Sequence, residues 1–122
     1  MDPLMKNKQF YHRLGFAASG VSAAWQRERS FRTQVLLGLG ATVFTVVFAP
    51  GLIWAAAVAL SIALVLALEL LNTAIECVID HLHPETAPEI KLAKDIAAGA
   101  VLMASVGAAT VGMLMIVSVF WR

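Results

Sequence analysis

The chain has 122 residues, of which 60% are hydrophobic and 14% are charged, and its mean hydropathy is +0.80. A soluble globular domain of ordinary composition is excluded, because such domains carry about 25% charged residues. A membrane span takes about 20 apolar residues, so three spans fill half of the chain and leave little for a separate soluble domain. We therefore predict a single membrane domain over residues 1–122, with membrane lipids around it and no nucleic-acid partner.

Residues 8–29 form an amphipathic segment that is rich in basic and aromatic side chains. Its apolar residues recur every three or four positions, which is the spacing of one helix face. They are Phe10, Leu14, Ala17, Val21 and Trp25. We predict a helix that lies in the plane of the membrane interface. The alternative is an ordinary basic flank of the first span.

Three apolar stretches follow, and each predicts a transmembrane helix. They are residues 33–49, 52–82 and 93–121. Pro50-Gly51 separates the first two, and a polar loop over residues 81–92 precedes the third. The third stretch is rich in alanine and glycine, which let helices approach closely in lipid. The predicted fold is an all-α membrane protein with one surface helix and three spans.

The lysines and arginines predict the orientation of this fold. All of them except Arg122 lie in the N-terminal segment or in residues 81–94, and the Pro50-Gly51 turn has none. The positive-inside rule places such segments in the cytoplasm. We therefore predict a multi-pass protein of the bacterial plasma membrane whose N-terminus and second loop are cytoplasmic.

A stripe of polar side chains ends the second predicted span. Residues 52–68 carry no charge, and then Glu69, Asn72, Glu76 and Asp80 follow at spacings of three, four and four. These spacings place all four residues on one helix face, and we call them the polar stripe. A carboxylate at the bilayer centre costs roughly 2.5–3.5 kcal/mol, so a chain that keeps several is expected to use them.

The charged residues near the predicted cytoplasmic surface indicate phosphoryl transfer. Glu69 and Glu76 lie two helical turns apart, about 10 Å, which suits two different roles better than one shared metal. Glu28 ends the surface helix, and Lys94-Asp95 begins the third span. Carboxylates bind Mg²⁺, and a lysine attracts phosphate. A deeper glutamate can take a proton from a hydroxyl that arrives through the lipid.

Each of these residues also has a structural interpretation. Glu69 and Asn72 can join neighbouring helices as polar contacts within the membrane. Glu28 can pair with Arg32, four residues further on. Lys94 can begin a helix and extend its ammonium to the interface.

The polar stripe also admits an interpretation without catalysis. Its first three residues can line a water-filled path in an oligomeric channel, and Asp80 can cap the helix at the interface. Glu28 and Lys94-Asp95 favour the enzyme, because a pore does not need them at the surface. The single cysteine, Cys77, is interpreted as a small apolar residue.

Three blocks of sequence resemble one known family. They are A-A-W-Q-R-E-R-S-F-R at residues 23–32, E-L-L-N-T-A-I-E-C-V-I-D at 69–80 and A-K-D-I-A-A-G-A-V at 93–101. They closely resemble the bacterial integral-membrane diacylglycerol kinases, a family that also contains undecaprenol kinases. The resemblance implies a homotrimer with active sites shared between protomers. It also implies transfer of the γ-phosphoryl of MgATP to a lipid hydroxyl, with diacylglycerol as the first choice of acceptor and undecaprenol as the alternative.

The resemblance also assigns the residues of the site. It implies that Glu69 is the general base and that Glu28 and Glu76 hold Mg²⁺ on the phosphates. Asn72 then bridges the base and the phosphates. The remaining nucleotide contacts are Glu85, Lys94 and Asp95. The residues that border the path of the lipid are Ala23, Ala24, Trp25 and Phe31.

Several positions depart from the pattern of the family. Gln34 stands where well-known members often carry glutamate, and Gln9, Phe16 and Ala17 stand where some carry arginine, tyrosine and serine. The nucleotide or substrate contacts of those positions are therefore not carried over. Thr73 and the A-A-G-A-V run resemble the undecaprenol branch, whereas the A-A-W opening resembles the diacylglycerol branch, so the sequence does not decide between the two lipids.

Overall fold

A computed structural model of the protein describes the backbone of residues 3–121 and the side chains of residues 9–121. Four helices make up nearly all of this range, and no strand occurs within it. They are α1 (Pro3–Arg27), α2 (Arg29–Phe48), α3 (Leu52–Leu82) and α4 (Pro88–Phe120). The predicted all-α class is confirmed.

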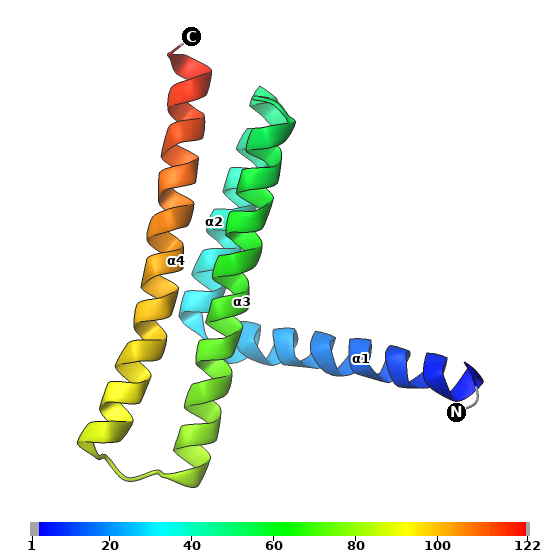
Figure 1. Ribbon diagram of the computed structural model, residues 1–122, viewed down its shortest axis with the longest axis vertical. Helices are drawn as coiled ribbons and strands as arrows, with labels where there is room; N and C mark the ends of the chain where they lie inside the picture. The colour runs from blue at the N-terminus through cyan, green and yellow to red at the C-terminus, as the bar shows by residue number, and fades with distance from the viewer. Residues whose placement is uncertain (1–2, 122) are drawn as a thin grey trace.

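The last three helices run side by side, and α1 leaves this bundle to one side (Figure 1). Each of α2, α3 and α4 is long and apolar enough to cross a membrane. At about 1.5 Å per residue, the 20 residues of α2 match the hydrocarbon core of about 30 Å. The 31 residues of α3 and 33 of α4 exceed it, so one end of each extends beyond that thickness.

Three helices begin earlier than the sequence predicts. The surface helix was predicted from residue 8, whereas α1 starts at Pro3. The first predicted span starts at residue 33, whereas α2 starts at Arg29. The third starts at 93, whereas α4 starts at Pro88, so the loop is 83–87 and not 81–92. Hydropathy marks where the apolar part of a helix begins. Pro88 begins the helix itself, because its fixed φ suits the first turn and its missing N–H is not needed there.

A single residue breaks the chain between α1 and α2. Glu28 has an extended backbone, with φ −115° and ψ 111°, and its N–H donates to the carbonyl of Ala24 at 2.8 Å. The guanidinium of Arg32 folds back over the break and donates to the carbonyls of Trp25 at 2.8 Å and Gln26 at 3.3 Å. These are carbonyls that the end of a helix leaves without partners. Arg32 therefore fixes the angle at which α1 leaves the bundle.

The second break is confirmed at Pro50-Gly51. The residue before it, Ala49, has φ 42°, and Gly51 has φ 126°. The φ of Gly51 is one that glycine adopts without strain because it lacks a Cβ. The chain reverses here, and α3 runs back along α2.

Helix α3 is the centre of the bundle, because it packs against both α2 and α4. Gly38 lets α2 approach α3 closely: a Cβ at this position would lie 3.1 Å from Cγ2 of Ile62. At the end of the bundle far from α1, the rings of Phe44, Phe48 and Phe120 pack together, with centroids 4.4–6.4 Å apart. The buried apolar side chains are Ala24, Phe31, Val58, Val65 and Met115.

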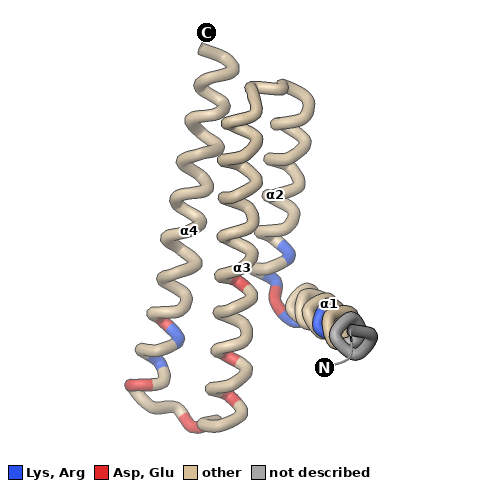
Figure 2. The backbone as a smooth tube through the Cα atoms, turned by 45° about the vertical axis from the view of Figure 1, so that its right-hand side comes forward, with Lys and Arg blue, Asp and Glu red and all other residues tan. Residues whose placement is uncertain are grey.

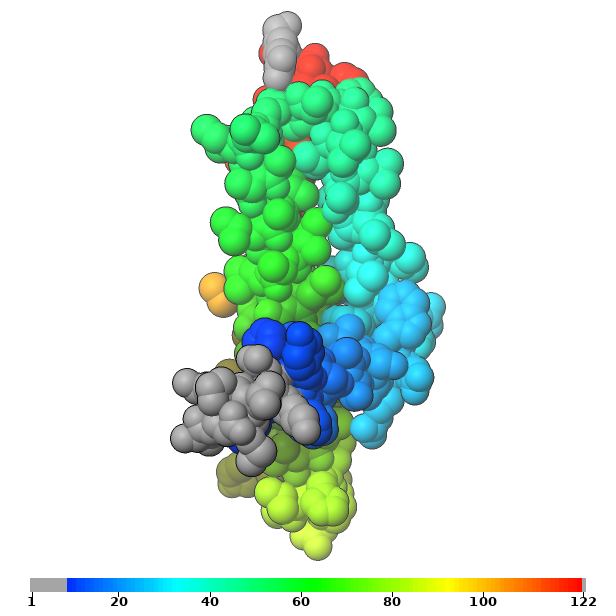
Figure 3. Space-filling model, turned by 90° about the vertical axis from the view of Figure 1, so that its right-hand side faces the viewer, coloured from blue at the N-terminus to red at the C-terminus, as the bar shows by residue number. Residues whose placement is uncertain are grey.

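Most of the apolar surface of the spans points outward. Leu52 is 88% exposed, and large apolar side chains are exposed along all three spans. Figure 3 shows α1 end-on against the lower part of α2 and α3, with the surface of both spans open above it. Such a surface suits lipid or further protein and not water.

Candidate active site

The charged side chains gather at one end of the spans. In Figure 2 the coloured segments of α2, α3 and α4 all lie toward the end that holds α1 and the α3–α4 loop, and the rest of each span is uncharged. The polar stripe belongs to this end. The structure therefore brings the predicted site residues to the same part of the molecule.

Glu69 is the most deeply buried member of the polar stripe. It is 3% exposed and is the one charged residue that is buried in the described part of the chain. The hydroxyl of Ser30, in the first turn of α2, donates to its Oε2 at 3.1 Å. No other side chain among residues 9–121 donates to this carboxylate. Glu69 thus joins two helices, as the structural interpretation expected, while its Oε1 stays available.

Asn72 and Glu76 form the middle of the polar stripe. The amide Nδ2 of Asn72 donates to Oε1 of Glu76 at 3.4 Å. The amide oxygen Oδ1 of Asn72 is buried and has no partner in the described residues. A buried acceptor without a partner costs about 1–3 kcal/mol. This oxygen therefore suits a donor or a cation that arrives with a ligand.

Asp80 and Lys94 join the ends of α3 and α4. The ammonium of Lys94 donates to Oδ1 of Asp80, and Lys94 is 35% exposed at the side chain. Within α4, Lys91 pairs with Asp95 at 2.7 Å, and both side chains are exposed. Lys91 was not among the predicted site residues, although its spacing of four residues from Asp95 is the signal for such a pair.

Glu28 and Glu85 lie at the two breaks of this end of the molecule. Glu28 is half-buried at the α1–α2 break, and within the described residues its carboxylate forms no ion pair. The expected alternative, a pair with Arg32, is wrong, because that guanidinium donates to backbone carbonyls instead. Glu85 is exposed in the α3–α4 loop, where its carbonyl lies 3.1 Å from Nδ1 of His83.

The donors near Glu76 fit a magnesium ion that is shared with a ligand. Among residues 3–121, no three His, Cys, Asp or Glu side chains form a group that could hold a metal ion. Mg²⁺ is commonly held by one or two carboxylates, with phosphate oxygens and water as its other ligands. The carboxylate of Glu76 and the unpartnered oxygen of Asn72 are oxygen donors of this kind.

A cavity of about 390 Å³ lies between α1 and α3. Its lining from α1 includes Ala23 and Ala24, and its lining from α3 includes Leu70 and Thr73. Its lining on α3 begins at Leu70, the neighbour of Glu69 in sequence, although Glu69 itself does not line it, and most of the lining side chains are apolar. Two of the four residues that the resemblance assigns to the path of the lipid therefore border a real cavity.

The other two residues assigned to the lipid path lie differently. Trp25 is 41% exposed on α1, whereas Phe31 is 3% exposed and packs inside the chain. At the rim of the cavity, Nη1 of Arg27 lies 3.6 Å from Sγ of Cys77. Cys77 is exposed and lines the cavity.

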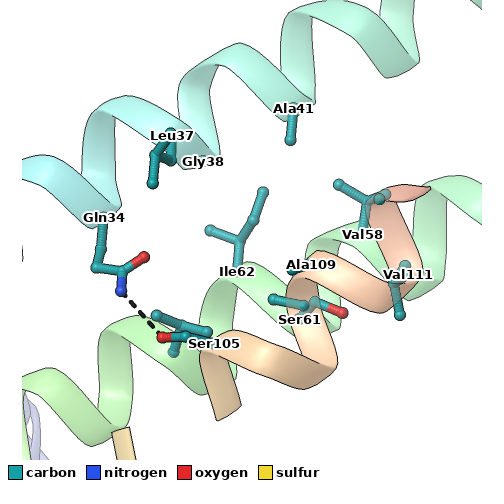
Figure 4. A pocket seen from close by; sticks show the side chains of 13 residues that line it. Gln34, Leu37, Gly38, Ala41, Val58, Ser61, Ile62, Ser105, Ala109 and Val111 are labelled. Carbon is teal, nitrogen blue, oxygen red and sulfur yellow. Dashed lines mark hydrogen bonds between the residues drawn. The ribbon is translucent and has the colours of Figure 1, made fainter. Parts of the chain in front are cut away.

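The positions that depart from the family pattern lie in different places. Gln9, Phe16 and Ala17 are exposed on α1, and Ala17 also lines the cavity between α1 and α3. Gln34 instead crosses the bundle and donates from Nε2 to Oγ of Ser105 at 3.0 Å, at one end of a second cavity of about 370 Å³ between the three spans (Figure 4). Gln34 therefore joins α2 to α4 within the membrane.

The fold and these side chains first define a class: an all-α membrane protein with a buried carboxylate where a surface helix meets three candidate spans. Comparison with known proteins then gives the family. The family described as prokaryotic diacylglycerol kinase matches residues 15–116. The chain belongs to this family, and the resemblance drawn from its three sequence blocks is confirmed.

Two relatives carry the same name. A diacylglycerol kinase of Synechocystis sp. is 41% identical over 98 residues, which cover 80% of this chain and 56% of the relative. A diacylglycerol kinase of Escherichia coli strain K12 is 34% identical over 90 residues, 74% of each protein. The match therefore spans little more than half the length of the Synechocystis protein. Both relatives are named as kinases, which supports the expectation of an enzyme.

Proposed function

We propose that the protein is an ATP-dependent lipid kinase that transfers the γ-phosphoryl of MgATP to the hydroxyl of diacylglycerol and forms phosphatidic acid. The observation that carries this proposal is the buried carboxylate of Glu69 within the membrane domain, beside an apolar cavity that opens between α1 and α3. Membership of the prokaryotic diacylglycerol kinase family supports the same reaction.

In this mechanism Glu69 is the general base. Its Oε1 takes the proton of the lipid hydroxyl, and the lipid oxygen attacks the γ-phosphorus of ATP. The bond between that phosphorus and the β–γ bridging oxygen breaks, so that ADP leaves and the phosphoryl group stays on the lipid. The cavity beside Ala23 and Ala24 would receive the apolar part of the lipid.

The polar groups closer to the chain breaks would hold the nucleotide. Glu28 and Glu76 would bind Mg²⁺, which neutralises charge on the phosphates. The unpartnered Oδ1 of Asn72 supports a ligand at this point. Asp95 and Glu85 are assigned to the nucleotide by the family resemblance alone.

Lys94 would supply a positive charge to the phosphates. Its ammonium has three N–H donors, and Asp80 accepts from one of them. The others can reach a phosphate oxygen without breaking that pair. We therefore assign Lys94 to the nucleotide phosphates, and its pair with Asp80 is compatible with that contact.

We also infer the assembly and the location. The exposed apolar surface of the spans supports the homotrimer that the resemblance implies, with sites shared between protomers. The distribution of lysine and arginine supports a bacterial plasma-membrane protein with the site on the cytoplasmic side. Both inferences can be checked by cross-linking in native membranes and by accessibility of cysteines introduced into the α3–α4 loop.

A second acceptor is undecaprenol. Thr73, which resembles the undecaprenol branch, lines the cavity between α1 and α3. Ala23 and Ala24, which belong to the A-A-W opening that resembles the diacylglycerol branch, line the same cavity. Both lipids present a hydroxyl on an apolar tail, and the same helices can admit either.

The test is phosphorylation of the two lipids in competition. Purified protein in detergent micelles is given radiolabelled ATP, Mg²⁺ and an equal amount of each lipid. We expect label mainly in phosphatidic acid. Label mainly in undecaprenyl phosphate would replace the first acceptor by the second. Label in neither lipid would refute the kinase and favour the channel.

A further inference from the structure

We infer that Ser30 is a positioning residue for the reaction, because its hydroxyl holds the Glu69 carboxylate so that Oε2 is occupied and Oε1 faces the substrate proton. The inference rests on the proposed function of Glu69 as the base. It adds a residue that had no predicted role, on a different helix and 39 positions away along the chain.

The hydrogen bond joins two helices at a partly buried point, where Ser30 is exposed and Glu69 is buried. Oγ of Ser30 donates to Oε2 of Glu69 at 3.1 Å, and Glu69 is almost completely buried. Because a glutamate side chain has several rotatable bonds, a carboxylate without this donor can turn among more than one orientation. A buried carboxylate also depends on its donors more than an exposed one, since no water replaces them.

Ser30 behaves differently from six other hydroxyls of the spans. Thr33, Thr42, Thr45, Ser61, Thr73 and Thr110 each donate to the carbonyl four residues earlier on the same helix. This is the usual bond of a hydroxyl within a helix. Ser30 is too close to the break at Glu28 for that bond, and the carbonyl four residues before it, on Gln26, accepts from Arg32. Its hydroxyl is therefore directed across to α3.

The turn that carries Ser30 is held in place on both sides. Its neighbour Phe31 is buried, and Arg32 fastens the end of α1 to the start of α2. A hydroxyl on a fixed turn can orient a carboxylate more closely than one on a loop, which is what a general base requires. The break at Glu28 thus places a candidate metal ligand and the positioning hydroxyl two residues apart.

The experiment compares Ser30→Ala, Ser30→Thr and the control Thr33→Ala, each measured for kcat and for KM of ATP and of lipid. We expect Ser30→Ala to lower kcat roughly tenfold, because a hydrogen bond to a charged group is lost, with both KM values unchanged. Ser30→Thr keeps the hydroxyl and restores kcat. Thr33→Ala removes a hydroxyl of the same helix that serves its own backbone, and it keeps the kcat of the unmodified protein.

A second measurement does not depend on activity. Infrared difference spectra of Ser30→Ala against the unmodified protein should show a shifted carboxylate band, and that shift should vanish when both proteins also carry Glu69→Gln. Circular dichroism and elution volume check that each variant is folded.

The inference is overturned by full kcat in Ser30→Ala, by an equal loss in Thr33→Ala or by failure of Ser30→Thr to restore kcat. A rise in KM for lipid at constant kcat would make Ser30 a substrate contact and would also overturn it. If the unmodified protein phosphorylates no lipid, the proposed function fails, and the infrared shift alone decides whether Ser30 orients Glu69.

Discussion

The variant Glu69→Gln separates the chemistry of the site from its binding. Glutamine has nearly the same size as glutamate, and its amide oxygen can still accept the hydrogen bond that Ser30 donates at 3.1 Å. It cannot take a proton from a hydroxyl at neutral pH. Since Glu69 is 3% exposed, water cannot readily replace the missing base.

The expected loss follows from the role of a general base. Removing such a group typically lowers the rate by about 10²–10⁴-fold, which corresponds to roughly 3–5 kcal/mol in the barrier. The nucleotide contacts proposed for Glu76 and Lys94 lie one turn or more away from Glu69 and are untouched. We therefore expect kcat to fall by at least about a hundredfold, while the Kd of MgATP stays within about twofold.

Two assays on the same protein make this comparison. Transfer of radiolabel from ATP to diacylglycerol gives kcat, and quenching of a fluorescent ATP analogue gives the Kd. Glu89→Gln is the matched control, because Glu89 is an exposed carboxylate in the first turn of α4 that has no proposed role. Retained turnover in Glu69→Gln would assign the base to another residue. A large rise in the Kd of MgATP, with a proportionate loss of kcat, would make Glu69 a nucleotide ligand.

Three further predictions concern the contacts around the site. Gly38→Val should lower the free energy of unfolding by about 1–3 kcal/mol through overpacking, since its Cβ would lie 3.1 Å from Cγ2 of Ile62. Combination with Ile62→Ala should recover most of this loss in detergent unfolding. Simple additivity of the two effects would show that the two residues do not touch. Arg32→Gln should lower the free energy of unfolding by about 1 kcal/mol, because it removes the cap on α1. It should also lower kcat, because the turn of Ser30 loosens. An unchanged melting temperature and an unchanged kcat would contradict this. Lys94→Met should raise the KM of ATP roughly tenfold. Asp80→Asn, which releases the ammonium of Lys94, should leave that KM within about twofold. Equal KM values in the unmodified protein and in Lys94→Met would remove Lys94 from the nucleotide site.

The sequence predicts those parts of the fold that depend on residues close together along the chain. The bounds of α3 agree with the prediction, because the Pro50-Gly51 break precedes it and a polar loop follows it. The start of α4 was missed by five residues, since the helix begins at a proline within polar sequence while the prediction relied on hydropathy. The surface helix was expected over 8–29, and α1 instead spans Pro3–Arg27.

The sequence also predicts which residues are unusual without showing what they touch. The cost of a carboxylate in a membrane singled out Glu69, and its burial agrees. Its contact with Ser30 lies across 39 residues, and Gln34 meets Ser105 across 71. No periodicity in one segment contains such pairs, because they depend on how the helices pack. Phe31 illustrates the same limit, since a residue expected beside the lipid is buried within the chain.

The central claim is that the polar stripe serves phosphoryl transfer and does not merely join helices or line a pore. A variant of the polar stripe itself tests this claim most directly. The measurement is transfer of labelled phosphate from ATP to diacylglycerol by Glu76→Gln, with Glu89→Gln beside it. We expect no detectable transfer by Glu76→Gln with its oligomer intact, and near-normal transfer by Glu89→Gln. Full activity of Glu76→Gln would contradict it.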